Sequence, residues 1–179
     1  ILSTLSFEFF LSTSYIEGGM FEYLETLLDL IESQYWIEEF HVLPRLLSTA
    51  ILYARDMGLN RWEFYVGLDE EVAEKRRTVW WKCYGWDKYI SINTGKEPMI
   101  HDSTISCLYP NCCRKAGFID PDEMLESIHK LLVPLDMELY ELLQYAHIAL
   151  SRIVGDFYCN VLYNQKYTDF RNHAKPEKL

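Results

Sequence analysis

The chain has 179 residues, of which 49% are hydrophobic and 15% aromatic, which is enough apolar material for one packed domain. Its formal net charge of −10 repels phosphate, which makes this segment a poor candidate for direct nucleic-acid contact, so that any DNA-related role would need a separate basic module. No uncharged apolar stretch reaches the roughly 18 residues of a membrane-spanning helix, so we expect no contact with a membrane. The five cysteines are odd in number and lack zinc-ligand spacing, which favours structural thiols in a reducing compartment and no bound metal.

Apolar residues recur at helical spacing along nearly the whole chain, and the sequence contains no β-hairpin signal. In chain order, the predicted helices cover residues 2–10, 21–31, 43–54, 69–93, 120–133 and 139–161. The segment 94–119 has no clean period and is long for a loop, which is typical of a connection that is functional, packed on the surface or mobile. We therefore predict an all-α, bundle-like domain of about six helices over residues 1–167, followed by a polar tail over 168–179.

Several helix ends carry recognisable signals. Pro44 suits the first turn of the third helix, and Gly58 suits its C-terminal end. Asp69 is a good N-cap for the fourth helix, because its carboxylate can accept from the free amides of the first turn. Asp120 followed by Pro121 is an equally strong start for the fifth helix. These signals fix where we expect the helices to begin and end.

The predicted helix 69–93 has apolar residues around much of its circumference, so we expect it to be buried on more than one side. Asp87 then lies among apolar neighbours, where an unpaired carboxylate is costly and needs a cation. Arg55, at the end of the preceding helix, is one candidate partner, and Arg76 or Arg77 is another. An arginine fits because its planar guanidinium can hold a carboxylate with two hydrogen bonds.

An ordered series of residues between Ala54 and Asp102 is the most specific pattern in the chain. It begins with the sequence Ala-Arg-Asp-Met-Gly-Leu-Asn-Arg at positions 54–61 and continues with Glu-Lys-Arg-Arg-Thr-Val-Trp-Trp at 74–81. It ends with a turn, Gly-Lys-Glu-Pro at 95–98, and an Ile-His-Asp sequence at 100–102. Its signature positions are Arg55, Asp56, Gly58, Arg76, Arg77, Trp80, Trp81, Tyr84, Asp87, Gly95 and Asp102.

This series resembles the fungal-specific transcription factor domain, the middle homology region of fungal zinc-cluster regulators. Met57, Lys88 and the inserted Glu97 are mild departures from the family pattern. The resemblance implies a non-catalytic nuclear domain that is part of a larger helical regulatory domain. It implies control of transcription through dimerisation, intramolecular control or small-molecule sensing, with zinc and DNA binding supplied by a separate module. An alternative within the family is a helical scaffold in a chromatin-associated complex.

A metal-centre hypothesis rests on two Glu-x-x-His pairs, Glu38 with His41 and Glu126 with His129, as in helical di-iron proteins. Such a centre also needs a glutamate from each of two other helices, for which Glu8, Glu25 or Glu74 could serve. His41 instead lies at a helix end, just before Pro44, and the tryptophan-rich series has no role in such a centre. This hypothesis is therefore the weaker alternative.

A small-molecule hypothesis rests on the aromatic residues of the same helix. Trp80, Trp81, Tyr84 and Trp86 supply apolar walls with polar tips, which are typical of ligand sites, and a bound apolar ligand would be their partner. The competing interpretation is that these side chains fill the core, because aromatic residues bury large areas. We find no catalytic motif in the sequence and predict no enzymatic activity.

Overall fold

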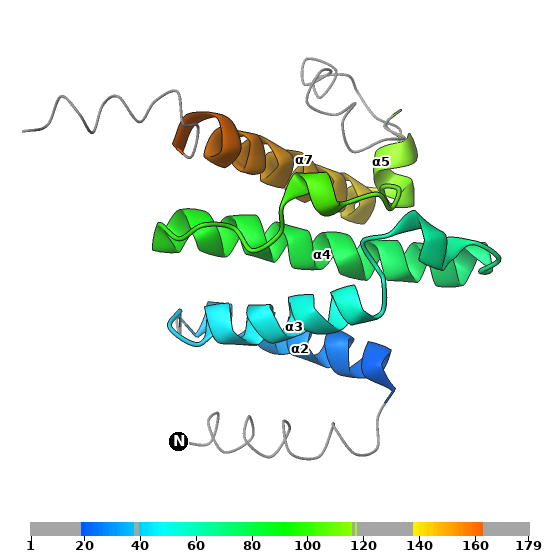
Figure 1. Ribbon diagram of the computed structural model, residues 1–179, viewed down its shortest axis with the longest axis horizontal. Helices are drawn as coiled ribbons and strands as arrows, with labels where there is room; N and C mark the ends of the chain where they lie inside the picture. The colour runs from blue at the N-terminus through cyan, green and yellow to red at the C-terminus, as the bar shows by residue number, and fades with distance from the viewer. Residues whose placement is uncertain (1–18, 38–39, 116, 118–137, 163–179) are drawn as a thin grey trace, which may run out of the picture.

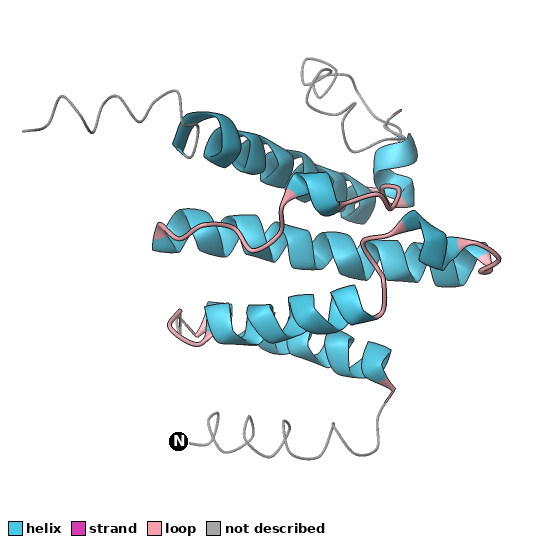
Figure 2. Cartoon of the chain, in the orientation of Figure 1, coloured by secondary structure: helices cyan, strands magenta, loops and turns pink. Residues whose placement is uncertain are grey.

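The computed structural model describes residues 19–37, 40–115, 117 and 138–162, and all regular structure in these residues is helical (Figure 2). The all-α prediction is therefore confirmed. The α-helices are α2 (Met20–Trp36), α3 (Leu43–Asp56), α4 (Glu70–Thr94), α5 (Asn111–Lys115) and α7 (Leu139–Phe157). Shorter turns are η1 (Trp62–Tyr65), η2 (Asp102–Thr104) and the π-helical η4 (Tyr158–Leu162). The predicted helices 2–10 and 120–133 and the tail 168–179 lie outside the described residues.

Helix α4 is the centre of the fold. It lies between the pair formed by α2 and α3 on one side and α7 on the other (Figure 1). Helix α5 packs against the beginning of α7. Because α4 has neighbours on both sides, it buries residues around its circumference, as its sequence predicts. Within the described part of the chain, no helix is long and apolar enough to span a lipid bilayer.

The ends of α4 follow from local chemistry. Asp69 is the N-cap, and its carboxylate accepts a hydrogen bond from the amide of Glu71 at 2.9 Å. Gly95 closes the helix with a left-handed backbone, at a φ of 66°, which glycine adopts without the steric penalty of a side chain. The predicted span of about 69–93 is therefore confirmed to within a residue or two.

The connection between α4 and α5 is long and mostly irregular, but it packs against the helices. It returns along α4, where Ile100, Cys107 and Tyr109 are buried. The backbone amides of Ser106 and Cys107 donate to the carbonyl of Asn60, which joins this connection to the end of α3. The prediction of a surface-packed connection is confirmed by these contacts.

Helix α7 forms as its periodicity predicts, yet its apolar stripe points away from the core. The side that faces α4 contains Tyr145, Ile148, Ala149, Ser151, Arg152 and Gly155. The exposed side contains most of the leucine-rich positions that predicted the helix, including Leu143 and Leu150. Periodicity identified the helix, but it did not identify which of its sides the other described residues cover.

Candidate functional site

The signature residues lie along α4 and on the two segments that contact it, and their charged members other than Asp56, together with Tyr84, take part in three polar clusters. None of these positions forms a recognisable catalytic arrangement. The first two clusters join neighbouring segments to the N-terminal half of α4, and the third joins the following turn and α7 to its C-terminal half.

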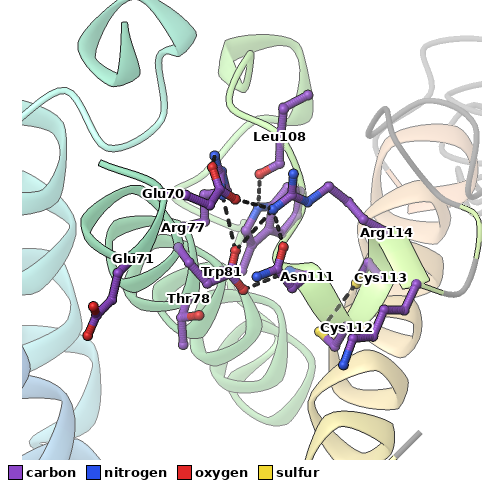
Figure 3. Close-up of polar contacts among 12 residues, drawn as sticks. Glu70, Glu71, Arg77, Thr78, Trp81, Leu108, Asn111, Cys112, Cys113 and Arg114 are labelled. Carbon is purple, nitrogen blue, oxygen red and sulfur yellow. Dashed lines mark hydrogen bonds and ion pairs between the residues drawn. The ribbon is translucent and has the colours of Figure 1, made fainter. Parts of the chain in front are cut away.

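The first cluster joins α5 to the beginning of α4 (Figure 3). Arg77, which is almost fully buried, donates to the carboxylates of Glu70 and Glu74 at 3.0 and 3.1 Å. Arg114 reaches the same two carboxylates from α5, at 2.7 and 3.5 Å. Arg77 and Arg114 lower the pKa of Glu70 to about 2 through these hydrogen bonds. Two glutamates and two arginines thus compensate each other's charge where Arg114 of α5 reaches α4.

The second cluster joins α3 to α4. Arg76 donates from Nη2 to the carbonyl of Met57 at 2.7 Å, which satisfies a free carbonyl at the end of α3. Gly58 follows with a left-handed backbone, and a Cβ atom there would lie 2.4 Å from the ring of Phe64. Gly58 is therefore required by both its conformation and its close ring contact. Its signature neighbour Asp56 lies on the exposed surface.

The third cluster begins with Asp87, and here the predicted arginine partner is wrong. The Asp87 carboxylate accepts hydrogen bonds from the backbone amides of Met99 and Ile100, each at 2.9 Å. The nearby cation is Lys88, whose Nζ lies 3.6 Å from the carboxylate. Arg55 does approach this turn, but it donates to the carbonyl of Met99. The prediction failed because backbone amides can also satisfy a buried carboxylate, and residue spacing does not reveal them.

Asp102 connects α4 to α7 across this turn. Its carboxylate accepts from the hydroxyl of Tyr84 at 2.9 Å and lies 2.8 Å from Nη1 of Arg152. Nζ of Lys88 lies 3.5 Å away and donates to the carbonyl of Ile100 at 2.5 Å. We call Tyr84, Lys88, Asp102 and Arg152 the Asp102 cluster. It holds a buried arginine of α7 against two buried side chains of α4.

Gly155 allows this close approach of α7 to α4. A Cβ atom at this position would lie 2.9 Å from the Tyr84 hydroxyl and 3.2 Å from Oδ2 of Asp102. Sequence reasoning missed both Gly155 and Arg152. One signal in the sequence could have found them. Apart from one histidine, Arg152 is the single basic residue between positions 139 and 157, and it lies three residues before Gly155, on the same side of the helix.

The four aromatic candidates for ligand binding lie in packed surroundings. Trp80, Trp81 and Tyr84 are essentially inaccessible, as the core-packing interpretation predicts. Trp81 stacks on Tyr109 and donates its indole N–H to the carbonyl of Leu108 at 3.0 Å (Figure 3). Trp86 is half-buried and contacts other aromatic rings. A pocket does open beside the Asp102 cluster, but none of the four aromatic candidates lines it. Its walls are formed by Lys88, Glu97, Pro98, Ile100, His101, Tyr158 and Cys159.

The residues considered as metal ligands have other partners or lie outside the described residues. Glu74 binds Arg77 and Arg114, and Glu25 lies 2.9 Å from Lys75. Glu8, Glu38, Glu126 and His129 lie outside the described ranges. Among the residues that the structure places, no three ligand-type side chains are grouped as a metal site would require.

The cysteines are mostly buried thiols. Burial raises the pKa of Cys83 and of Cys107 to about 12, so neither is a reactive thiolate at neutral pH. The neighbouring Sγ atoms of Cys112 and Cys113 lie 3.9 Å apart within α5 and are also buried. Cys159 is exposed.

The comparisons with known proteins agree with this architectural signature. The fungal-specific transcription factor domain matches residues 23–178. The transcription factor PDR1 of Candida glabrata is 39% identical over 168 residues, which cover 90% of this chain and 15% of that protein. The transcription factor TOG1 of Saccharomyces cerevisiae is 37% identical over 175 residues, which cover 94% of this chain and 22% of that protein.

The transcription factor PDR1 of Saccharomyces cerevisiae is 37% identical over 157 residues, which cover 86% of this chain. The chain spans about a fifth or less of the length of these relatives. No solved structure has significant similarity to it. The extent of the family match and the identity to these transcription factors show that the chain belongs to the fungal-specific transcription factor domain family.

Proposed function

We propose that this chain is a non-catalytic regulatory domain of a nuclear zinc-cluster transcription regulator and that it acts through protein contacts. The observation that carries the proposal is the Asp102 cluster, which fixes α7 on α4 with the apolar stripe of α7 directed outward. A side that is both rigidly held and apolar is suited to contact another protein surface. The polar side chains of the cluster bind one another, so their charges hold the two helices together.

DNA binding belongs, in this proposal, to a separate basic module that also holds the zinc. The net charge of −10 supports this division, because an acidic surface opposes phosphate contacts. The similarity to proteins named as transcription factors supports the regulatory role. Dimerisation is the mechanism that the exposed stripe favours. Intramolecular control and small-molecule sensing remain proposals with less support from the described residues.

A reporter assay tests the proposal. The chain is inserted between a heterologous DNA-binding module and an activation segment, and transcription is compared with the same fusion lacking the chain. We expect the insert to change reporter output several-fold and Asp102→Asn to abolish that change at equal protein level. The matched control is Asp56→Asn, an exposed acid of the same signature, which should leave the effect intact. Equal output with and without the chain would contradict a regulatory role.

A further inference from the structure

Helix α5 contains a pair of thiols that the proposed function does not use. The Sγ atoms of Cys112 and Cys113 lie 3.9 Å apart, at hydrogen-bond distance for two thiols (Figure 3). Both side chains are buried, and neither is in a disulfide. Among the described residues, no second pair of cysteine Sγ atoms lies at hydrogen-bond distance. We call Cys112 and Cys113 the α5 dithiol.

The hydrogen bond within the α5 dithiol makes one of its sulfur atoms the better nucleophile. The Cys112 thiolate accepts from the S–H of Cys113, and this lowers the pKa of Cys112 from its usual value despite its burial. Burial without a thiol donor has the opposite effect at Cys83, whose pKa rises to about 12. The α5 dithiol therefore offers a favoured thiolate with a second sulfur beside it.

The spacing of the two sulfur atoms favours a bridging ligand over a direct disulfide. A disulfide needs Sγ atoms about 2.0 Å apart and Cα atoms usually more than about 4.4 Å apart, whereas neighbouring Cα atoms lie about 3.8 Å apart. Closing a disulfide would therefore strain the helical backbone of α5. A single soft atom bound to both sulfur atoms leaves them nearly in place, and thiolates select soft elements.

The number of available ligands identifies the class of compound. Structural zinc takes four ligands, and among the residues that the structure places no three ligand-type side chains are grouped. A trivalent organoarsenical is satisfied by two, because its arsenic atom keeps one carbon group and exchanges two hydroxyls. We propose that Cys112 and Cys113 together bind a trivalent organoarsenical through both sulfur atoms.

The binding step is a condensation. The Sγ atom of Cys112 attacks arsenic first, and that of Cys113 follows. Two S–As bonds form and two As–O bonds break, and each departing hydroxyl takes one thiol proton and leaves as water. Arsenic stays trivalent throughout, so the step needs no oxidant and no reductant. Because the second bond forms within one molecule, the pair binds far more tightly than a single cysteine does.

Access to the buried α5 dithiol requires a local opening of α5. A helix of five residues is not stable by itself in water, so α5 depends on its contacts with the neighbouring helices. Arg114 binds Glu70 of α4 at 2.7 Å, and Lys115 binds Glu141 of α7 at 2.5 Å. Ion pairs with exposed members contribute little each, so α5 opens at much lower cost than the whole domain. These ion pairs therefore set how often the two sulfur atoms become accessible.

Mass spectrometry with phenylarsine oxide, which carries two hydroxyls when hydrated in water, tests the proposal. The purified chain is freed of reductant, treated with this compound and washed with a monothiol, which displaces arsenic from single cysteines but not from a chelating pair. We expect one resistant phenylarsenic group per chain, mapped to Cys112 and Cys113. Cys112→Ser and Cys113→Ser should each weaken binding at least about 100-fold, as loss of one of two linked contacts does. The matched control is Cys159→Ser, which removes an exposed thiol and should bind as the wild type does.

Two results would overturn the proposal. One is a wild-type chain without a resistant adduct, and this measurement does not depend on the folding of any variant. The other is a resistant adduct that persists at wild-type affinity in Cys112→Ser or Cys113→Ser, with far-UV circular dichroism confirming that both variants fold.

The rate of arsenic uptake tests the opening step. Arg114→Gln should speed uptake about threefold or more, because it removes an ion pair that holds α5 closed. The matched control is Lys75→Gln, which removes the ion pair with Glu25 of α2 and should leave the rate unchanged. Equal rates for Arg114→Gln and the wild type would overturn the opening step. The α5 dithiol lies outside the Asp102 cluster, so these results are independent of the reporter assay.

Discussion

Replacing Asp87 measures how much the turn after α4 depends on one buried carboxylate. In Asp87→Ala, the amides of Met99 and Ile100 lose their acceptor, and each unsatisfied buried amide costs about 1–3 kcal/mol. The ammonium of Lys88 also loses a neighbouring negative charge. We therefore expect the free energy of unfolding to fall by about 3–4 kcal/mol, a large fraction of the stability of an ordinary domain.

The amide variant separates hydrogen bonding from charge. Burial raises the pKa of Asp87, which means that the folded state resists its ionisation, and a neutral side chain avoids that cost. Asp87→Asn keeps one acceptor oxygen, so we expect it to lower the free energy of unfolding by only about 1–2 kcal/mol. Urea denaturation followed by tryptophan fluorescence measures both variants. Asp56→Ala is the control, because exposed Asp56 should change stability by less than about 0.5 kcal/mol.

One result would refute this reasoning. If Asp87→Ala unfolds at the same urea concentration as the wild type, the two amides find other acceptors, and the carboxylate does not anchor the turn. If Asp87→Asn is as damaging as Asp87→Ala, the negative charge matters more than the hydrogen bonds, which would assign the main role to Lys88.

Two further predictions concern the neighbouring clusters. Gly155→Ala should lower the free energy of unfolding by about 1–3 kcal/mol, because its Cβ would press on Tyr84 and Asp102, and an unchanged thermal midpoint would contradict the close contact. Glu70→Gln should destabilise the chain by less than about 1 kcal/mol near neutral pH, since Glu70 is largely exposed. Because the folded pKa lies near 2, below its usual value, this contribution is complete above about pH 4.5 and disappears as the pH falls toward 2. Denaturation at a series of pH values measures this contribution. A difference in the free energy of unfolding between Glu70→Gln and the wild type that stays constant down to pH 2 would contradict the pairing with Arg77.

Local interactions explain why much of the fold was predictable. Helix positions and ends depend on apolar spacing, capping side chains and glycine, all of which act within a few residues. Asp69 and Gly95 limit α4 where the sequence predicts, and Pro44 lies in the first turn of α3. The ordered series from Ala54 to Asp102 was also sufficient to indicate the family, and several of its charged residues lie at contacts between segments.

The partners of the charged residues depended on tertiary structure. Asp87 binds backbone amides twelve and thirteen residues later, and Asp102 binds Arg152 fifty residues later, which no local spacing encodes. The orientation of α7 was decided in the same way. Its leucine-rich side is the natural choice for the core, but Gly155 and Arg152 fit against Tyr84 and Asp102 and turn that side outward.

The sequence alone therefore determined helices α2, α3, α4 and α7 and the family, since both are encoded in short-range patterns, whereas α5 lies in a segment without a clean helical period. Only the tertiary structure showed which side of α7 the other described residues cover, because burial is a property of the packed arrangement of helices and not of any one of them.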